Sequence, residues 1–281
     1  MIDYDFYKDH ISCYKSPSFI EKEVNGRLLE RLEFINISPN SILELGSGHG
    51  YGVKLLQERF PSASLYAQDF NKEALNYMLE NKILGKNFIF DYNFNDGLPF
   101  KDNKFDLVVA NLSIQAADNI YKLLKSIDSI LSKDGIFIFS LLAEDSLSEF
   151  RDSWASCDSF QHVNPPISTQ AMSDLLQASP LTDIVIDCEN IILEYSNIKH
   201  ALKDIRNINE PLALIKMRRT LTGKNRWLKF ANSWTNKHQS GKILNTFQIM
   251  YGFACKNRSI DLEKNQDIKI NIKDIIKNKN N

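Results

Sequence analysis

Strand-type and helix-type segments alternate between residues 21 and 142, and this alternation limits the possible fold more than any other feature. Short apolar runs predict five strands, at 41–45, 64–68, 87–90, 105–110 and 136–142. Apolar residues at helical spacing predict the intervening helices, at about 21–35, 51–60, 71–81 and 117–131. This order is typical of an α/β domain with a doubly wound, mostly parallel sheet, whose strands end at one ligand-binding edge.

The second half of the chain is less regular. It predicts a helix at 168–178, a strand at 183–194, a basic and mostly helical stretch at 196–230, and a last strand at 246–254. We therefore expect an N-terminal helical cap over 1–35 and a main domain over 36–256, with a helical insertion at about 144–235. A polar, loosely ordered tail is expected over 257–281.

Composition excludes several classes of function. The formal net charge is -1, which argues against a whole-chain electrostatic grip on nucleic acid. The four cysteines form no C-x-x-C pair, so no metal site is expected. No apolar run is long enough to span a bilayer, and the first residues lack the pattern of a signal peptide. We expect a cytoplasmic protein that does not bind membranes.

A glycine-rich segment, ELGSGHG, follows the first predicted strand and precedes a predicted helix. Glu44 begins this segment, and Gly46, Gly48 and Gly50 alternate within it. Glycine allows a sharp turn and close approach of a ligand to the backbone, although an ordinary turn is the alternative. The dinucleotide fingerprint requires glycine at position 51, which is Tyr51 here, and this counts against a nicotinamide-dependent oxidoreductase.

Asp69 ends the next predicted strand, where a carboxylate can accept both hydroxyls of a ribose. Its alternative role is to cap the following helix. The pattern E-x-G-x-G-x-G resembles the first motif of class I methyltransferases. That resemblance implies a Rossmann-like sheet of seven strands with a closing antiparallel strand, and S-adenosylmethionine as cofactor. The cofactor-binding residues would be Glu44, Gly46, Ser47, Gly48, Gly50, Asp69, Asn93 and Asn111.

Two of these roles follow from the family's pattern. A polar side chain after the third strand contacts the adenine amine, and Asn93 is favoured here over Asp91 and Asn95. Asn111 begins the segment NLSIQ at the end of the fourth strand, where the methyl group is expected, although an ordinary loop is the alternative. Asp106 is expected to fix the strand structurally.

The second half carries more specific elements. HVN at 162–164, LTGK at 221–224 and YGFA at 251–254 resemble the malonyl-acyl-carrier-protein O-methyltransferases of biotin synthesis. The resemblance implies methyl transfer to the free carboxylate of a malonyl thioester. Arg206 would hold that carboxylate, with contacts from His162, Asn164 and Tyr14. A structural histidine and a solvated helix face are the respective alternatives for His162 and Arg206.

The resemblance also implies an acyl carrier protein carrying a malonyl group as partner, and a local excess of positive charge supports it. Between 199 and 230 the acids are Asp204 and Glu210, against nine bases at 199, 203, 206, 216, 218, 219, 224, 226 and 229. Such a surface steers acidic proteins, although an ordinary charged helical face is the alternative. The competing functions are methylation of another small carboxylate and a non-methylating role like that of assembly factors.

Overall fold

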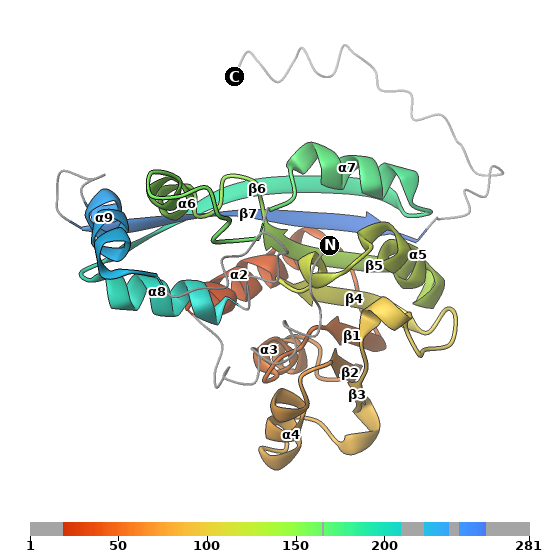
Figure 1. Cartoon of the computed structure of the whole chain (residues 1–281). Coiled ribbons are helices and arrows are strands. Elements are labelled where there is room, and N and C mark those ends of the chain that lie inside the picture. The colour runs from red at the N-terminus through yellow and green to blue at the C-terminus, as the bar shows by residue number, and fades with distance from the viewer. Residues whose placement is uncertain (1–18, 165, 209–221, 236–241, 257–281) are drawn as a thin grey trace, which may run out of the picture.

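The computed structural model describes residues 19–164, 166–208, 222–235 and 242–256. Its centre is a sheet of seven strands in the order β3-β2-β1-β4-β5-β7-β6 (Figure 1). The strands are β1 Ser41–Leu45, β2 Ser64–Asp69, β3 Ile89–Asp91, β4 Phe105–Asn111, β5 Leu131–Leu142, β6 Thr182–Tyr195 and β7 Ile243–Cys255. Strands β1 to β5 pair in parallel, whereas β7 is antiparallel to both β5 and β6. The predicted class I methyltransferase sheet with its closing antiparallel strand is confirmed.

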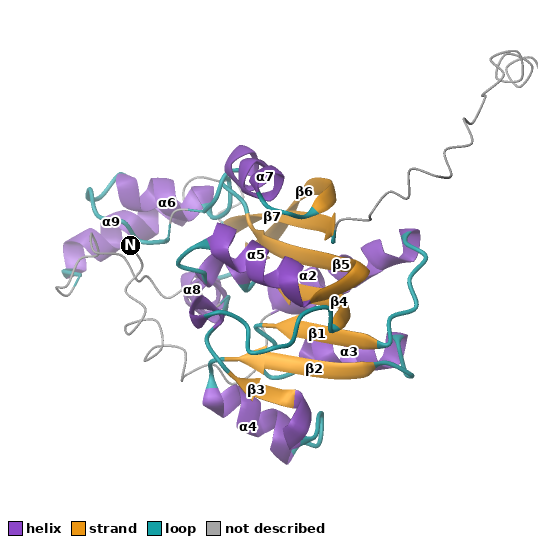
Figure 2. Cartoon of the chain, turned by 90° about the vertical axis from the view of Figure 1, so that its right-hand side faces the viewer, coloured by secondary structure: helices purple, strands orange, loops and turns teal. Residues whose placement is uncertain are grey.

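Helices cover both faces of the sheet (Figure 2). The α-helices are α2 Phe19–Glu30, α3 Tyr51–Arg59, α4 Lys72–Glu80, α5 Ile120–Ile130, α6 Ser148–Ala155, α7 Thr169–Ala178, α8 Ile198–Asn207 and α9 Lys224–Thr235. Short 3-10 helices lie at Arg31–Phe34, Lys86–Phe88, Phe94–Asp96 and Ile114–Ala116. The apolar faces of α2, α6, α8 and α9 share one core cluster, whereas those of α5 and α7 share another. The sheet separates these clusters because neighbouring residues of a strand point to opposite faces.

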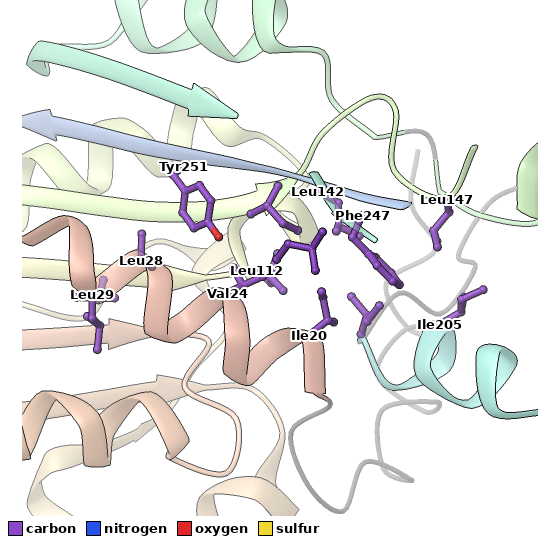
Figure 3. Packing of buried hydrophobic residues seen from close by; sticks show 14 of the residues in the cluster. Ile20, Val24, Leu28, Leu29, Leu112, Leu142, Leu147, Ile205, Phe247 and Tyr251 are labelled. Atoms are coloured by element: carbon purple, nitrogen blue, oxygen red, sulfur yellow. The ribbon is translucent and has the colours of Figure 1, made fainter. Parts of the chain in front are cut away.

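Helix α2 packs along one face of the sheet through residues three or four positions apart. Figure 3 shows Ile20, Val24 and Leu28 on this helix together with Leu142 and Phe247 from the sheet and Leu112, which follows β4. All three α2 side chains are fully buried. Burying an aliphatic side chain of this size contributes about 1.5–3 kcal/mol, so α2 is held firmly against the sheet.

The structure differs from the sequence prediction at three places. Strand β5 begins at Leu131, five residues before the predicted strand, and its first part is irregular, with a φ of 61° at Asp134. Helix α6 was not predicted from the sequence. The long basic stretch contains the two separate helices α8 and α9, and residues 209–221 between them lie outside the described part.

The proposed domain division remains a prediction. In the described residues, the predicted N-terminal cap corresponds to α2 and the 3-10 helix after it, and the predicted tail lies outside them. The predicted insertion at 144–235 contains strand β6 as well as helices. No helix in the described part of the chain is both long and apolar enough to cross a membrane.

Candidate functional site

The glycine-rich loop joins β1 to α3 at the carboxyl edge of the sheet. Its three glycines have positive φ angles, 69° at Gly46, 51° at Gly48 and 77° at Gly50, a region that other residues rarely adopt. The loop is held to β2, because the amides of Gly46 and Ser47 both donate to the carbonyl of Gln68, over 2.8 and 3.0 Å. Gly46 also passes close to Ser113, since a Cβ at Gly46 would lie 2.3 Å from the Cβ of Ser113.

Asp69 at the end of β2 ties the glycine loop to the start of α4. Its Oδ2 accepts the amide of Gly48 over 2.8 Å, and its Oδ1 accepts the amide of Asn71 over 2.8 Å. Burial raises the pKa of Asp69, whereas the hydrogen bonds from Asn71, Gly48 and Phe70 oppose that rise. A carboxylate offers about four acceptor positions, so Asp69 can accept further hydrogen bonds beside those from these amides. Asn71, rather than Asp69, is the residue that caps α4.

A pocket lies above the ends of β1 and β4, where the strand order reverses. This is the place at which doubly wound sheets bind ligands. Of the predicted cofactor residues, the pocket brings together Glu44, Gly46, Ser47, Gly48, Asp69 and Asn111. Gly50 is the N-cap of α3 and is not among the described lining residues. Ligand binding by these residues remains a prediction.

The described lining of the pocket is acidic. Glu21, Glu44 and Asp69 line it with carboxyl groups, and none of its described lining residues is a lysine or an arginine. Burial lowers the pKa of His49, the lining histidine, and so favours its neutral imidazole. Such a pocket suits a cationic ligand and opposes a pyrophosphate, which carries negative charge.

The end of β4 forms one wall of the pocket through side chains that are held in place. The amide of Asn111 donates to the carbonyl of Glu21 over 3.1 Å and its oxygen accepts the hydroxyl of Ser140 over 2.7 Å. Ser113 donates to the carbonyl of Leu45 over 2.7 Å. The side chain of Gln115 accepts the amide of Leu142 over 3.0 Å. These bonds join β4 to α2, β1 and β5 around the pocket.

Asp106 has the structural role expected for it. At the opposite edge of the sheet, its Oδ2 accepts the amides of Asn40 and Ser41 over 2.8 and 3.2 Å. Its Oδ1 accepts the hydroxyl of Ser132 over 2.7 Å. Asp106 therefore joins the starts of β1, β4 and β5.

Asn93 is not among the described residues that line the pocket. Its side chain accepts the amide of Asn95 over 3.0 Å and so caps the 3-10 helix that follows. The next residue, Phe94, is the one that lines the pocket from this segment. Contact between Asn93 and an adenine remains a prediction.

The predicted substrate residues lie away from the described lining of this pocket. His162 stacks on Trp154, with ring centroids 3.8 Å apart, and its Nε2 lies 2.9 Å from Asp158 Oδ1. Asn164 follows in the loop before α7, and Arg206 is exposed in the last turn of α8. Tyr14 lies outside the described residues. The contacts of His162 are those of a structural histidine, and all four substrate roles remain predictions.

The sequence reasoning missed Glu21, Asn25, His49 and Gly52, which also line the pocket. Glu21 and Asn25 come from α2, whose helical spacing gave no sign that this side of the helix faces a ligand. Gly52 could have been noticed, since a glycine in the first turn of a helix is unfavourable by about 1 kcal/mol without a packing reason. No group of three potential metal ligands occurs among the residues that the structure describes.

Comparison with known proteins agrees with this geometry. Residues 18–184 match the model of a methyltransferase domain. The chain is 31% identical over 259 residues to the malonyl-[acyl-carrier protein] O-methyltransferase of Nitrosospira multiformis, covering 86% of this chain and 84% of the relative. It is 27% identical over 267 residues to malonyl-[acyl-carrier protein] O-methyltransferase 1 of Coxiella burnetii, covering 94% and 91%.

The fold has close counterparts among solved structures. The YcgJ protein of Bacillus subtilis superimposes with a TM-score of 0.58 at 14% identity, over 83% of this chain and 98% of that one. At this identity the likeness concerns the fold alone, whereas the family follows from the matched domain and the relatives. The chain therefore belongs to the class I methyltransferases, in the family of the malonyl-[acyl-carrier protein] O-methyltransferases.

Proposed function

We propose that this chain uses S-adenosylmethionine to methylate the free carboxylate of a malonyl thioester on acyl carrier protein, early in biotin synthesis. The observation that carries the cofactor assignment is the pocket at the carboxyl ends of β1, β2 and β4, which is lined by carboxyl groups. The names of the relatives carry the assignment of the acceptor.

The pocket residues fit this cofactor. Asp69 accepts only part of the hydrogen bonds that a carboxylate can accept, so it can also accept the hydroxyls of a ribose. The space beside Gly48 is open, because a Cβ at this residue would meet no atom within 4 Å. Carboxyl groups at Glu21 and Glu44 favour a ligand that carries positive charge. When bound, S-adenosylmethionine supplies an electrophilic methyl group on a positively charged sulfur.

The acceptor demands little chemistry from the protein. A carboxylic acid has a pKa near 4, so the malonyl carboxylate is already ionised at neutral pH and needs no general base. The protein must instead align the carboxylate with the methyl group and exclude water. The firmly bonded wall at the end of β4, built on Asn111 and Ser113, supplies a rigid surface beside the expected methyl position.

Helices α8 and α9 provide a positively charged surface for the acidic carrier protein. Exposed bases occur on both helices, at Lys199, Lys203, Arg206, Lys224 and Lys229. Helix α8 follows the end of β6 and α9 precedes β7, so both lie towards the carboxyl edge of the sheet (Figure 1). A carrier protein docked there is on the same edge as the pocket.

The function is tested by incubating malonyl-acyl carrier protein with this protein and S-adenosylmethionine, followed by mass spectrometry of the carrier protein. The expected result is the gain of one methyl group by wild-type protein, and a much lower rate for Asp69→Ala because the ribose loses its acceptor. Arg206→Ala should leave cofactor binding intact but impair methylation if Arg206 holds the carboxylate. The absence of any methyl transfer by a protein that binds S-adenosylmethionine would contradict the proposed acceptor.

The carrier-protein surface has its own test, reversal of charge at Lys199 and Lys203. The double Glu variant should raise KM for malonyl-acyl carrier protein but not KM for malonyl-coenzyme A, since only the former docks by charge. Lys101→Glu combined with Lys133→Glu is the matched control, because these two exposed lysines lie before β4 and near the start of β5, at the opposite edge of the sheet. Equal effects of the reversal on both substrates would reject α8 as the docking surface.

The competing functions give different results in the same assays. A methyltransferase for another small acid would bind S-adenosylmethionine, leave malonyl-acyl carrier protein unmodified and methylate a free carboxylate. A non-methylating protein would bind the cofactor and methylate none of these acceptors. A nicotinamide-dependent enzyme would bind a dinucleotide, which the carboxyl groups of the pocket oppose.

A further inference from the structure

Two buried hydrogen-bond acceptors in the pocket have no donor among the residues that the structure describes. They are Asn25 Oδ1 on α2 and Glu44 Oε2 at the end of β1. Both residues line the pocket, and their exposed fractions are 4% and 2%. Buried polar atoms in proteins nearly always have partners. The pocket therefore lacks donors, which a ligand can supply.

The two acceptors belong to one rigid unit. The side-chain amide of Asn25 donates a hydrogen bond to the carboxyl group of Glu44, so the amide oxygen is the atom left without a partner. Gly52 makes room for this contact, because a Cβ there would lie 2.0 Å from Glu44 Oε1 and 2.5 Å from Asn25 Nδ2. Asn25 thus reaches the pocket because the second residue of α3, Gly52, has no side chain.

The position of this unit shows which part of a ligand it meets. Asp69, at the end of β2, is the residue expected to hold the ribose. Asn25 and Glu44 lie on the side of β1 and α2, and α2 is tied to the end of β4 by the bond from Asn111 to the carbonyl of Glu21. A ligand with its ribose at Asp69 therefore extends its other end towards α2 and β4.

We propose that Asn25 is a cofactor-binding residue, whose Oδ1 accepts a hydrogen bond from the α-ammonium group of S-adenosylmethionine while Glu44 Oε2 accepts another. The proposal rests on the proposed function, since it names a contact of that cofactor. An ammonium group has three donors and no acceptor, which matches two acceptors without donors. Desolvation raises the pKa of Glu44 to about 8, and a neighbouring cation favours the ionised carboxylate.

The test compares two ligands that share the nucleoside, S-adenosylhomocysteine with the ammonium group and 5′-methylthioadenosine without it. Asn25→Leu removes the acceptor at similar side-chain size, and calorimetry should show S-adenosylhomocysteine binding roughly 10- to 100-fold more weakly. Binding of 5′-methylthioadenosine should be unchanged. Glu30→Ala, at the exposed end of α2, is the control for changes to the helix.

Two results would overturn the assignment. One is wild-type affinity of Asn25→Leu for S-adenosylhomocysteine. The other is an equal loss of both ligands, which would show that Asn25 shapes the pocket as a whole rather than binding the ammonium group. If wild-type protein binds neither ligand, the proposed cofactor itself is wrong, and this outcome is distinct from a failure of Asn25 alone.

Discussion

Glu44 should make the ligand-free protein less stable as the pH rises, and Glu44→Gln should remove this dependence. Desolvation raises the pKa of Glu44 from the ordinary 4.5 to about 8, although bonds from Asn25 and Val53 partly oppose the shift. Between these two pKa values the native protein holds a proton that the unfolded chain has lost. Stability therefore falls as the pH rises through this range and becomes constant again above about pH 8.

The size of the effect follows from the shift. One pH unit corresponds to about 1.4 kcal/mol for one proton, so the native state loses about 3–4 kcal/mol between about pH 5 and pH 8. Glutamine has the same shape as glutamic acid and no proton to lose. The difference in free energy of unfolding, Glu44→Gln minus wild type, should increase by about that amount over the same range.

Urea denaturation followed by circular dichroism, at several pH values, measures this difference. The titration of Asp69 occurs in both proteins and largely cancels. Glu58→Gln is the control, since Glu58 is exposed on α3 and its loss removes the same formal charge. Parallel pH profiles for wild type and Glu44→Gln would refute the argument, because they would show that Glu44 is not a buried proton-binding group.

Three further predictions follow from the site and its supports. Gly46→Ala should reduce cofactor affinity at least about tenfold in calorimetry, because it strains a positive φ and brings a Cβ against Ser113. Asp106→Ala should lower the free energy of unfolding in urea by about 1–3 kcal/mol through lost backbone partners, yet leave cofactor affinity unchanged. Binding of S-adenosylmethionine should release a proton from Glu44 near neutral pH; calorimetry in two buffers would show this in wild type and not in Glu44→Gln.

Much of the fold could be predicted because its signals are local. The apolar run of β1 and the glycines after it mark a strand, a turn and a helix within twenty residues of sequence, roughly one βα unit. Helix α6 lacked such signals, since its N-cap Leu147 has a φ of 56° and provides no side-chain cap. Its position depends on aromatic contacts to α9, such as that between Phe150 and Phe230, whose ring centroids lie 5.4 Å apart. Contacts between segments so far apart in the chain cannot be predicted from the local sequence.

In the candidate site, too, the residues with local signals could be predicted from the sequence, whereas a residue placed by contacts between distant segments could not. Glu44 and Asp69 could be proposed from the sequence because each lies at the carboxyl end of a strand, and a parallel sheet binds its ligands at that edge. Asn25 could not, because its role depends on contact between α2 and the end of β1, residues far apart in the chain. Sequence spacing predicts which side of a helix is apolar, but it does not show that a polar residue beside that face meets a pocket.

The antiparallel direction of β7 brings the proposed docking surface and the proposed cofactor pocket to the same edge of the sheet. Because β7 runs opposite to β5, it begins at the edge where the parallel strands end. Helix α9 lies at that end of β7, since Trp234 Nε1 donates to the carbonyl of Leu244 over 3.3 Å. Strand β6 runs parallel to β5, since both are antiparallel to β7, so α8 follows it at the same edge. A parallel β7 would instead start at the opposite edge and carry α9 away from the pocket. Reversal of one strand therefore places a basic surface from the second half of the chain at the same edge of the sheet as the proposed cofactor pocket of the first half.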